Sequence, residues 1–171
     1  SALAALPLLA FLVSCAAEDR APQEASSTPA DAPLEWFEDL AAATGLDFRH
    51  VSGMSGRFYP PEISGPGVAL FDYDNDGDLD VLLVQGGVLG EDQSSVAPLS
   101  DGLFRNDLEI GPDGSASLQF TDVTAASGIT TRGYGQGVAT GDIDNDGWID
   151  VYLTGFGRNQ MFRGNGDGTF T

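Results

Sequence analysis

The sequence contains few of the side chains on which several classes of protein depend. Its single cysteine, Cys15, excludes an internal disulfide. Seven basic residues stand against 26 acidic ones, which gives a formal net charge of -19. Such a surface repels phosphate backbones, so we expect no nucleic-acid partner. The single histidine, His50, leaves little material for acid–base catalysis, and we interpret it as a packing or hydrogen-bonding residue.

The sequence also lacks an apolar run long enough to cross a bilayer. It begins with an apolar stretch over residues 1–13, which is too short for a span and is typical of the core of a secretory signal. This stretch ends in Leu12-Val13-Ser14-Cys15, which resembles a bacterial lipobox, the motif in which the cysteine is acylated. An ordinary cleavable signal and a buried structural cysteine are the alternatives. We predict a signal peptide over residues 1–15, lipidation at Cys15, and export to a bacterial outer membrane, facing the periplasm or the cell surface.

Residues 16–35 contain no hydrophobic period. Three prolines interrupt a mixture of Ala, Ser, Thr and Gln, so we predict a disordered tether between the lipid and the folded part. The sequence starts without a methionine and without a basic segment before the apolar stretch. We therefore expect it to begin inside the signal and to be a fragment of a longer chain.

Two acidic segments, residues 72–80 and 142–150, share one spacing of carboxylates. Aspartate occupies positions 1, 3, 5 and 9 of each segment, and glycine occupies position 6. Calcium binds roughly six to eight oxygen atoms, and a tight loop aims alternate side chains inward while position 7 offers its main-chain carbonyl. We predict two calcium sites with ligands at Asp72, Asp74, Asp76, Asp78, Asp80, Asp142, Asp144, Asp146, Trp148 and Asp150.

The repetition of this spacing distinguishes a metal site from a plain acidic turn. One Asp- and Asn-rich turn between strands is ordinary, but two copies with matching flanks favour a shared ligand. The two segments hold nine of the 26 acidic residues, and carboxylates that converge on an empty loop repel one another. A divalent cation offsets that repulsion, so we expect metal binding and folding to be coupled.

Similar acidic loops occur in EF-hand and dockerin proteins, but the residues that flank the loops of this chain argue against that assignment. The EF-hand pattern requires glutamate at position 12, where this chain has Leu83 and Leu153. Short β-branched and aromatic runs bounded by glycine surround both segments, which indicates strands. Each acidic loop is therefore predicted to join two strands.

Other repeated strings extend the two loops into a unit of four strands. The Phe-Arg string at residues 103–106 reappears at 161–165, and a Phe-x-Asp string followed by alanines and glycine occurs at 37–46 and 120–129. A polar, glycine-rich insertion over residues 86–100 accounts for the unequal spacing. Four antiparallel strands in about 60 to 70 residues predict an all-β fold of β-propeller blades, with about two blades of a seven-bladed ring.

The folded part divides into three segments. Residues 36–66 form a lead-in that starts with a ring-closing strand, residues 67–129 form the first blade, and residues 130–171 form a truncated second blade. The start of the lead-in resembles the last strand of a blade with no earlier strands before it. We expect it to complete the final blade of the intact protein. Without that partner its exposed edge is an aggregation liability.

The strings around both acidic loops resemble FG-GAP or VCBS-type repeats, the calcium-loop blades of integrin-like propellers. In addition, the run from residue 46 to residue 69 resembles the start of cartilage acidic protein-like proteins, also called the ASPIC/UnbV group. The resemblance covers residues 36–171. It implies an extracellular propeller with calcium in the blade loops, and such propellers are mostly binding scaffolds rather than carriers of one settled activity.

Two functions from different classes are compatible with this pattern. The first is a membrane-anchored, calcium-binding scaffold without catalytic residues, which presents loops such as residues 86–100 to an unidentified protein or glycan in adhesion. The alternative is the propeller part of a secreted, calcium-dependent enzyme that acts on polysaccharides. Outside the loops, Glu62 is the acid of most interest and is expected to be a surface carboxylate. Arg105 and Arg163 are expected to pair with nearby carboxylates.

Overall fold

Two larger antiparallel sheets and a two-stranded ribbon form the folded part of the chain in a computed structural model that describes residues 37–89 and 99–171. The chain divides into two units, Ser1–Glu38 and Asp39–Thr171, and the fold below is that of the second unit. The predicted signal peptide, Cys15 and the tether lie outside the described residues. No helix within the described ranges has the length and apolar character that a membrane crossing needs.

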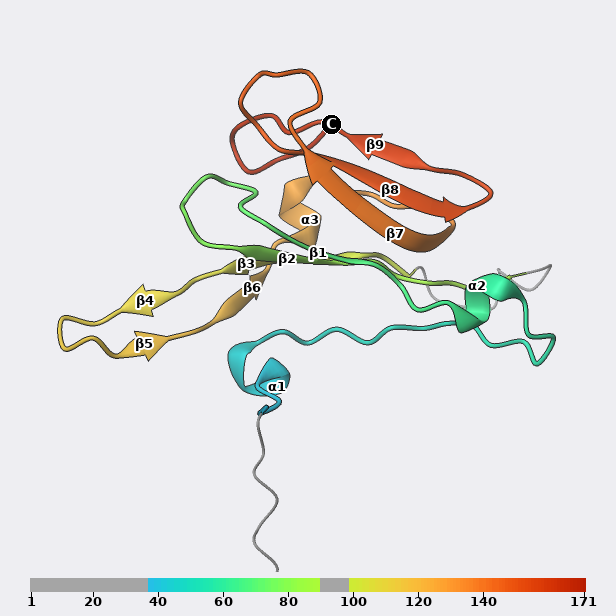
Figure 1. The fold of residues 1–171 in the computed structure, drawn as a ribbon, viewed down its shortest axis with the longest axis horizontal. Coiled ribbons are helices and arrows are strands. Elements are labelled where there is room, and N and C mark those ends of the chain that lie inside the picture. The colour runs from blue at the N-terminus through green and yellow to red at the C-terminus, as the bar shows by residue number, and fades with distance from the viewer. Residues whose placement is uncertain (1–36, 90–98) are drawn as a thin grey trace, which may run out of the picture. The chain divides into compact units, whose positions relative to one another are not determined.

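The first sheet has the four strands predicted for a blade, paired in the order β1, β2, β3, β6 (Figure 1). Their bounds are β1 (Val68–Phe71), β2 (Asp80–Leu83), β3 (Gly102–Asn106) and β6 (Phe120–Asp122). All three pairings are antiparallel. Leu82 of β2 lies opposite Leu103 of β3, and both side chains are fully buried. The predicted blade is therefore confirmed, and the first acidic loop joins β1 to β2.

A short ribbon extends the outer half of this blade. Strands β4 (Glu109–Ile110) and β5 (Ala116–Ser117) pair antiparallel as a separate sheet, which projects beyond β3 and β6 in Figure 1. The turn between them closes with a hydrogen bond of 2.8 Å from the Gly111 N–H to the Ser115 carbonyl. Both strands are exposed on every residue. The ribbon is therefore a β-hairpin, and its turn contains Gly114 in a left-handed conformation with φ 81°.

The second sheet repeats the arrangement with β7 (Tyr134–Gly141), β8 (Asp150–Phe156) and β9 (Gln160–Phe162). A fourth strand begins after β9, because Gly164 bridges to Phe170 and the main chains of Arg163 and Thr171 exchange hydrogen bonds of 2.8 and 2.9 Å. Strand β7 begins at Tyr134, three residues before Gly137. A register shift between Gly135 and Gly137 lets it continue past a bulge.

Each Phe-x-Asp string is followed by one helical turn that ends in a left-handed glycine. Helix α1 (Ala41–Thr44) is capped by Gly45 at φ 86°, and α3 (Thr124–Ser127) by Gly128 at φ 81°. A Cβ on Gly45 would lie 2.7 Å from the Phe120 carbonyl oxygen. A Cβ on Gly128 would lie 2.9 Å from that of Phe170. Helix α1 therefore contacts the first blade in the same way as α3 contacts the second. Residues 37–40 do not form a strand in the described structure. The ring-closing role of this segment remains a prediction.

One apolar core lies between the two sheets. Its buried members are Phe71, Leu82, Val84, Leu103, Ile129, Val151, Leu153, Phe162 and Phe170. The first strands of the two blades approach closely, since a Cβ on Gly67 would lie only 2.8 Å from the Cα of Gly137. The opposite face of the first sheet is covered in part by the lead-in, where Phe48 packs edge-on against Phe104 with ring centroids 6.5 Å apart. The lead-in then forms helix α2 (Pro60–Ile63) before entering β1.

Candidate metal centre

The first acidic loop folds around the carboxylate of Asp72. Its two oxygens accept hydrogen bonds from the main-chain N–H groups of Asp76 at 3.1 Å and Gly77 at 3.0 Å. The chain reverses through left-handed conformations at Asn75, φ 59°, and Gly77, φ 100°, which asparagine and glycine adopt most readily. The Asp-x-Asp-Asn-Asp-Gly order thus produces a tight loop with its side-chain oxygens gathered inside.

The second loop has the same hydrogen bonds at the same positions. Asp142 accepts from the N–H groups of Asp146 at 3.0 Å and Gly147 at 2.9 Å. Asn145 and Gly147 again have positive φ angles, 61° and 95°. Because both the sequence and the main-chain conformation are repeated, the two loops are structural copies of one another.

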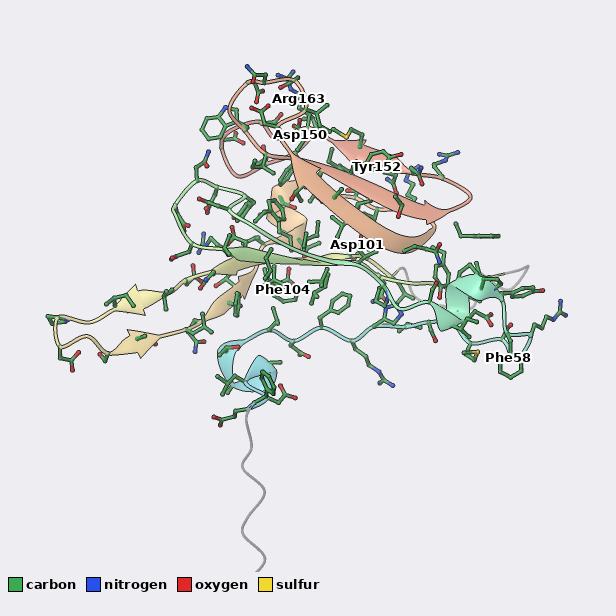
Figure 2. The ribbon with its side chains drawn as sticks, viewed as in Figure 1. Phe58, Asp101, Phe104, Asp150, Tyr152 and Arg163 are labelled. Carbon is green, nitrogen blue, oxygen red and sulfur yellow. The ribbon has the colours of Figure 1, made fainter. Side chains whose placement is uncertain are left out.

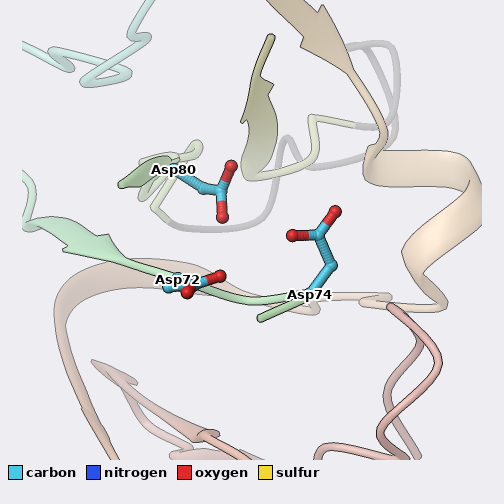
Figure 3. Close-up of side chains that lie close together, drawn as sticks. All are labelled: Asp72, Asp74 and Asp80. Carbon is cyan, nitrogen blue, oxygen red and sulfur yellow. The ribbon is translucent and has the colours of Figure 1, made fainter. Parts of the chain in front are cut away.

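Three aspartate carboxylates converge in each loop. The first group is Asp72, Asp74 and Asp80, and the second is Asp142, Asp144 and Asp146. Within each group every residue offers an oxygen that lies within 4.8 Å of the others. Figure 3 shows the first group, with the Asp74 carboxylate extending into the space beside Asp72 and Asp80. Of the predicted ligands, Asp76 and Asp78 lie outside the first group, and Trp148 and Asp150 lie outside the second.

The aspartate at position 9 joins each loop to its blade, at the end of the third strand in the first blade and just after the third strand in the second. Asp80 is fully buried and accepts from the N–H groups of Tyr73 at 2.9 Å and Asn106 at 2.8 Å. Asp150 is equally buried and accepts from Ile143 and Gly164, both at 2.9 Å. Burial raises the pKa of Asp80 to about 6, against the opposing effect of its two hydrogen bonds. These two residues therefore have a structural role beside any role as ligands.

Position 7 contributes main-chain contacts to the loops. The N–H groups of Asp78 and Trp148 donate to Oδ1 of Asp76 and Asp146, at 2.9 and 3.0 Å. This hydrogen bond turns the chain between positions 5 and 9. The side chain of position 7 is therefore free to differ between the copies, as aspartate and tryptophan do.

Asp74 differs from the other loop aspartates in the environment of one of its carboxylate oxygens. Its Oδ1 is shielded from solvent and accepts no hydrogen bond from any described residue. Partial burial raises the pKa of the Asp74 carboxyl, and the neighbouring charges of Asp76 and Asp72 raise it further. A buried, unsatisfied carboxylate oxygen beside two other carboxylates is a donor set of hard oxygens. It fits a divalent cation of the calcium type better than a soft metal that prefers sulfur or imidazole.

The second loop contains a positive group of its own. Nε of Arg163 lies 2.7 Å from Oδ2 of Asp144, and its Nη2 lies 2.7 Å from Oδ2 of Asp146. The hydrogen bond from Arg163 is the main reason why the pKa of Asp146 is lowered. In the first blade Arg105 pairs instead with Asp107, also at 2.7 Å. The predicted pairing of both arginines with carboxylates is confirmed.

The difference between the two arginines was missed at the level of sequence, although a signal for it exists. Asp107 follows Arg105 by two residues, whereas the corresponding position after Arg163 is Asn165. The first arginine thus has a carboxylate within its own strand end, and the second must reach into the loop. Figure 2 shows Arg163 beside Asp150 at the loop end of the second blade.

Glu62 was expected on the surface, and this expectation is wrong. Its side chain is only 5 % exposed, because it turns back under the segment that precedes α2. One oxygen accepts from the Ser55 N–H at 3.1 Å and the other from the Tyr59 N–H at 3.2 Å. A hydrogen bond from the Ser55 hydroxyl is the main reason why the pKa of Glu62 is lowered, and the two main-chain hydrogen bonds lower it further against the opposing effect of burial. The proline pair before it gave no indication of this inward direction.

The fold and the loops together define an all-β protein built from propeller-type blades, with one acidic loop between the first two strands of each blade. Residues 142–171, which hold the second loop, β8 and β9, match the family model described as FG-GAP-like repeat. This match supports the predicted repeat family and a propeller-type domain of the adhesion-like, extracellular kind. Comparison with curated proteins found no match to the chain.

Proposed function

We propose that this chain is a calcium-binding propeller segment with one cation site in each acidic loop. The observation that carries the proposal is Oδ1 of Asp74, a buried carboxylate oxygen without a hydrogen-bond donor. It lies in a group of three aspartates whose oxygens are within 4.8 Å of one another. Carboxylates in this arrangement repel one another, and a hard divalent cation is the ligand that removes the repulsion.

Different aspartates have different roles in forming each site. Asp72 and Asp142 fold the loops through main-chain hydrogen bonds. Asp80 anchors the first loop to β3 through Asn106, while Asp74 presents its unsatisfied oxygen. A bound cation would supply positive charge to groups that belong to different parts of the blade. Because the unfolded chain cannot hold these groups together, cation binding stabilises the folded blade.

We further propose that the protein is a non-catalytic scaffold for a protein or glycan ligand, exported and held at a bacterial outer membrane through lipid on Cys15. The FG-GAP-like repeat at residues 142–171 supports an extracellular binding role. The lipobox resemblance supports the anchor, and the net charge of -19 argues against nucleic acid as the ligand. Labelling cells with a radioactive fatty acid tests the anchor. A Cys15→Ala variant should lose the label, and equal labelling of this variant would overturn it.

Calorimetric titration of the full chain with calcium tests the metal sites, together with thermal melts in calcium and in chelator. We expect two sites, each adding about 2.7 kcal/mol of stability at a calcium concentration 100 times its dissociation constant. The Asp74→Asn variant should retain one site. Asp113→Asn is a matched control, because Asp113 is an aspartate of the β4–β5 turn whose carboxylate accepts hydrogen bonds from Ser115, away from both acidic loops, and it should retain both.

A folded chain that gives no heat of binding and no melting shift would overturn the calcium proposal. The same holds if Asp74→Asn binds calcium with the stoichiometry and affinity of the unmodified chain. Magnesium provides a further comparison, since its small size and octahedral preference suit a flexible carboxylate loop less well. We expect weaker binding of magnesium at both loops.

A further inference from the structure

The arginines within the described ranges divide between the two ends of the sheets. Arg105 and Arg163 lie at the end that carries the acidic loops, and both are paired with carboxylates. Four others, Arg49, Arg57, Arg132 and Arg158, lie in segments that lead into β1 or β7 or connect β8 to β9, at the opposite strand ends. None of these four forms an ion pair with a residue in the described ranges.

Two of the unpaired arginines border a single hollow. The hollow has a volume of about 1170 Å³, and its lining includes Arg49, His50, Arg57 and Tyr59. No described aspartate or glutamate lines it, although the chain has 26 acidic residues. In addition, Nδ1 of His50 is shielded from solvent and has no hydrogen-bond partner in the described part of the molecule. We call this feature the arginine hollow.

Hydrogen bonds from buried side chains hold the segment that forms the wall of the arginine hollow. The buried Glu62 holds the segment before α2 through the N–H groups of Ser55 and Tyr59. The hydroxyl of Tyr134, in the second blade, lies 2.9 Å from the carbonyl oxygens of both Ser52 and Pro61. The hollow is therefore preformed, which limits the entropy that a ligand must offset on binding.

The same segment holds an aromatic residue in a strained conformation. Phe58 has φ 57°, which is rare for a bulky residue, and its side chain is 70 % exposed. Figure 2 shows it in the segment that precedes α2. Strain of this kind persists where the surrounding structure enforces it, and it concentrates at binding sites. Next to it, Tyr59 presents a second aromatic ring beside the guanidinium of Arg57, whose Nη1 donates to the Tyr59 hydroxyl at 3.2 Å.

We propose that the arginine hollow binds the anionic group, carboxylate or sulfate, of an acidic polysaccharide. Guanidinium groups match the planar, two-oxygen geometry of a carboxylate. The hydroxyl of Ser52 can bond to sugar hydroxyls, and the ring of Tyr59 offers an apolar face, with that of Phe58 exposed beside it in the chain. Protein partners are usually recognised through large apolar anchors in dry pockets, whereas this hollow is open and lined mainly by polar groups. The inference rests on the proposed scaffold function and names the class of its ligand.

The test is calorimetric binding of uronic-acid oligosaccharides to the full chain in calcium. A methyl-esterified oligosaccharide of the same length removes the charge, and a sulfated oligosaccharide distinguishes sulfate from carboxylate. Arg57→Gln and Arg49→Gln should each weaken binding about tenfold, as expected for loss of a charge-assisted hydrogen bond. Arg158→Gln is the matched control, because Arg158 is unpaired at the same end but does not line the hollow, and it should bind as the unmodified chain does.

Each outcome assigns success or failure to one proposal. Equal binding of the charged and esterified sugars, or equal binding by Arg57→Gln and the unmodified chain, would overturn the anion site. Binding of poly-glutamate without binding of either charged oligosaccharide would overturn the polysaccharide class. Because every sample is also titrated with calcium, a chain that binds calcium but no sugar refutes only this inference. A chain that binds sugar but no calcium refutes only the metal proposal.

Discussion

Nε of Arg163 lies 2.7 Å from Oδ2 of Asp144, so the second acidic loop holds a cation supplied by the chain itself. The first loop has no such contact, because Arg105 turns to Asp107. The two loops share their sequence spacing and their main-chain hydrogen bonds, yet they differ in counter-charge. This difference predicts that they differ in their response to an added cation.

Replacing Arg163 by glutamine should increase the calcium affinity of the second loop by roughly threefold to tenfold. The guanidinium competes with the metal for oxygens of Asp144 and Asp146, and its removal leaves them free. The effect is modest because the ion pairs are partly exposed, and such pairs contribute only about 0 to 1 kcal/mol each. Calorimetric titration at low ionic strength would measure it.

The matched control is Arg105→Gln, which removes the equivalent arginine from the first blade. Arg105 contacts Asp107, outside the loop, so its loss should change calcium affinity less than the loss of Arg163. If Arg163→Gln leaves the affinity unchanged or lowers it, the arginine is not a competitor for the loop. Lower affinity would indicate instead that it holds Asp144 and Asp146 in place.

The contribution of Asp80 to the stability of the metal-free protein should decrease as the pH rises from about 4 to 6. Burial raises the pKa of Asp80 to about 6 in the folded state, so the folded chain binds a proton more tightly than the unfolded chain. Stability from this group is therefore present at low pH and is lost as pH increases through the folded pKa. The loss amounts to on the order of 2 kcal/mol.

Urea unfolding in chelator at several pH values would measure this loss. The Asp80→Asn variant should show a flatter dependence on pH over the same window, although it will be less stable throughout because one main-chain donor loses its acceptor. Calcium should also flatten the dependence, since a nearby cation favours the ionised carboxylate. A variant with an unchanged pH dependence would assign the effect to another group.

The sequence predicts the blades well because their signals are local. Short β-branched and aromatic runs bounded by glycine give β1, β2, β7 and β8, and the repeated glycine after each alanine turn gives the left-handed ends of α1 and α3. These features depend on neighbouring residues and on main-chain sterics. The residues of the acidic loops were identified on the same basis.

The features that the sequence did not predict depend on contacts between distant segments. Glu62 is buried because it caps the segment that begins at Ser55, a direction that no periodicity encodes. The double function of Asp80 follows from its hydrogen bond to Asn106, which lies 26 residues away. The arginine hollow likewise requires the lead-in to return along the first blade, where the side-chain amide of Gln85 donates to the Arg49 carbonyl at 3.0 Å. Local patterns contain no information on such pairings.

Replacing Glu62 by glutamine should loosen the wall of the arginine hollow without affecting the metal loops. Glutamine keeps one acceptor oxygen, so either Ser55 or Tyr59 loses its hydrogen bond. Hydrogen exchange of amides in residues 55–59 should accelerate, whereas calcium titration should be unchanged. Unaltered exchange in this segment would mean that other contacts, such as that of Tyr134, suffice to hold it.

Replacing Gly67 by alanine should destabilise the packing between the two blades. The added methyl group would lie 2.8 Å from the Gly137 Cα and 2.9 Å from the Val138 nitrogen, both of which are main-chain atoms that cannot rotate away. Overpacking of this kind costs about 1 to 3 kcal/mol. Gly65→Ala is the control, since a Cβ there has nothing within 4 Å, and its effect should stay within about 0.5 kcal/mol. Equal stability of the two variants in urea unfolding would show that β1 and β7 separate easily, and that each blade is stabilised mainly by its own contacts.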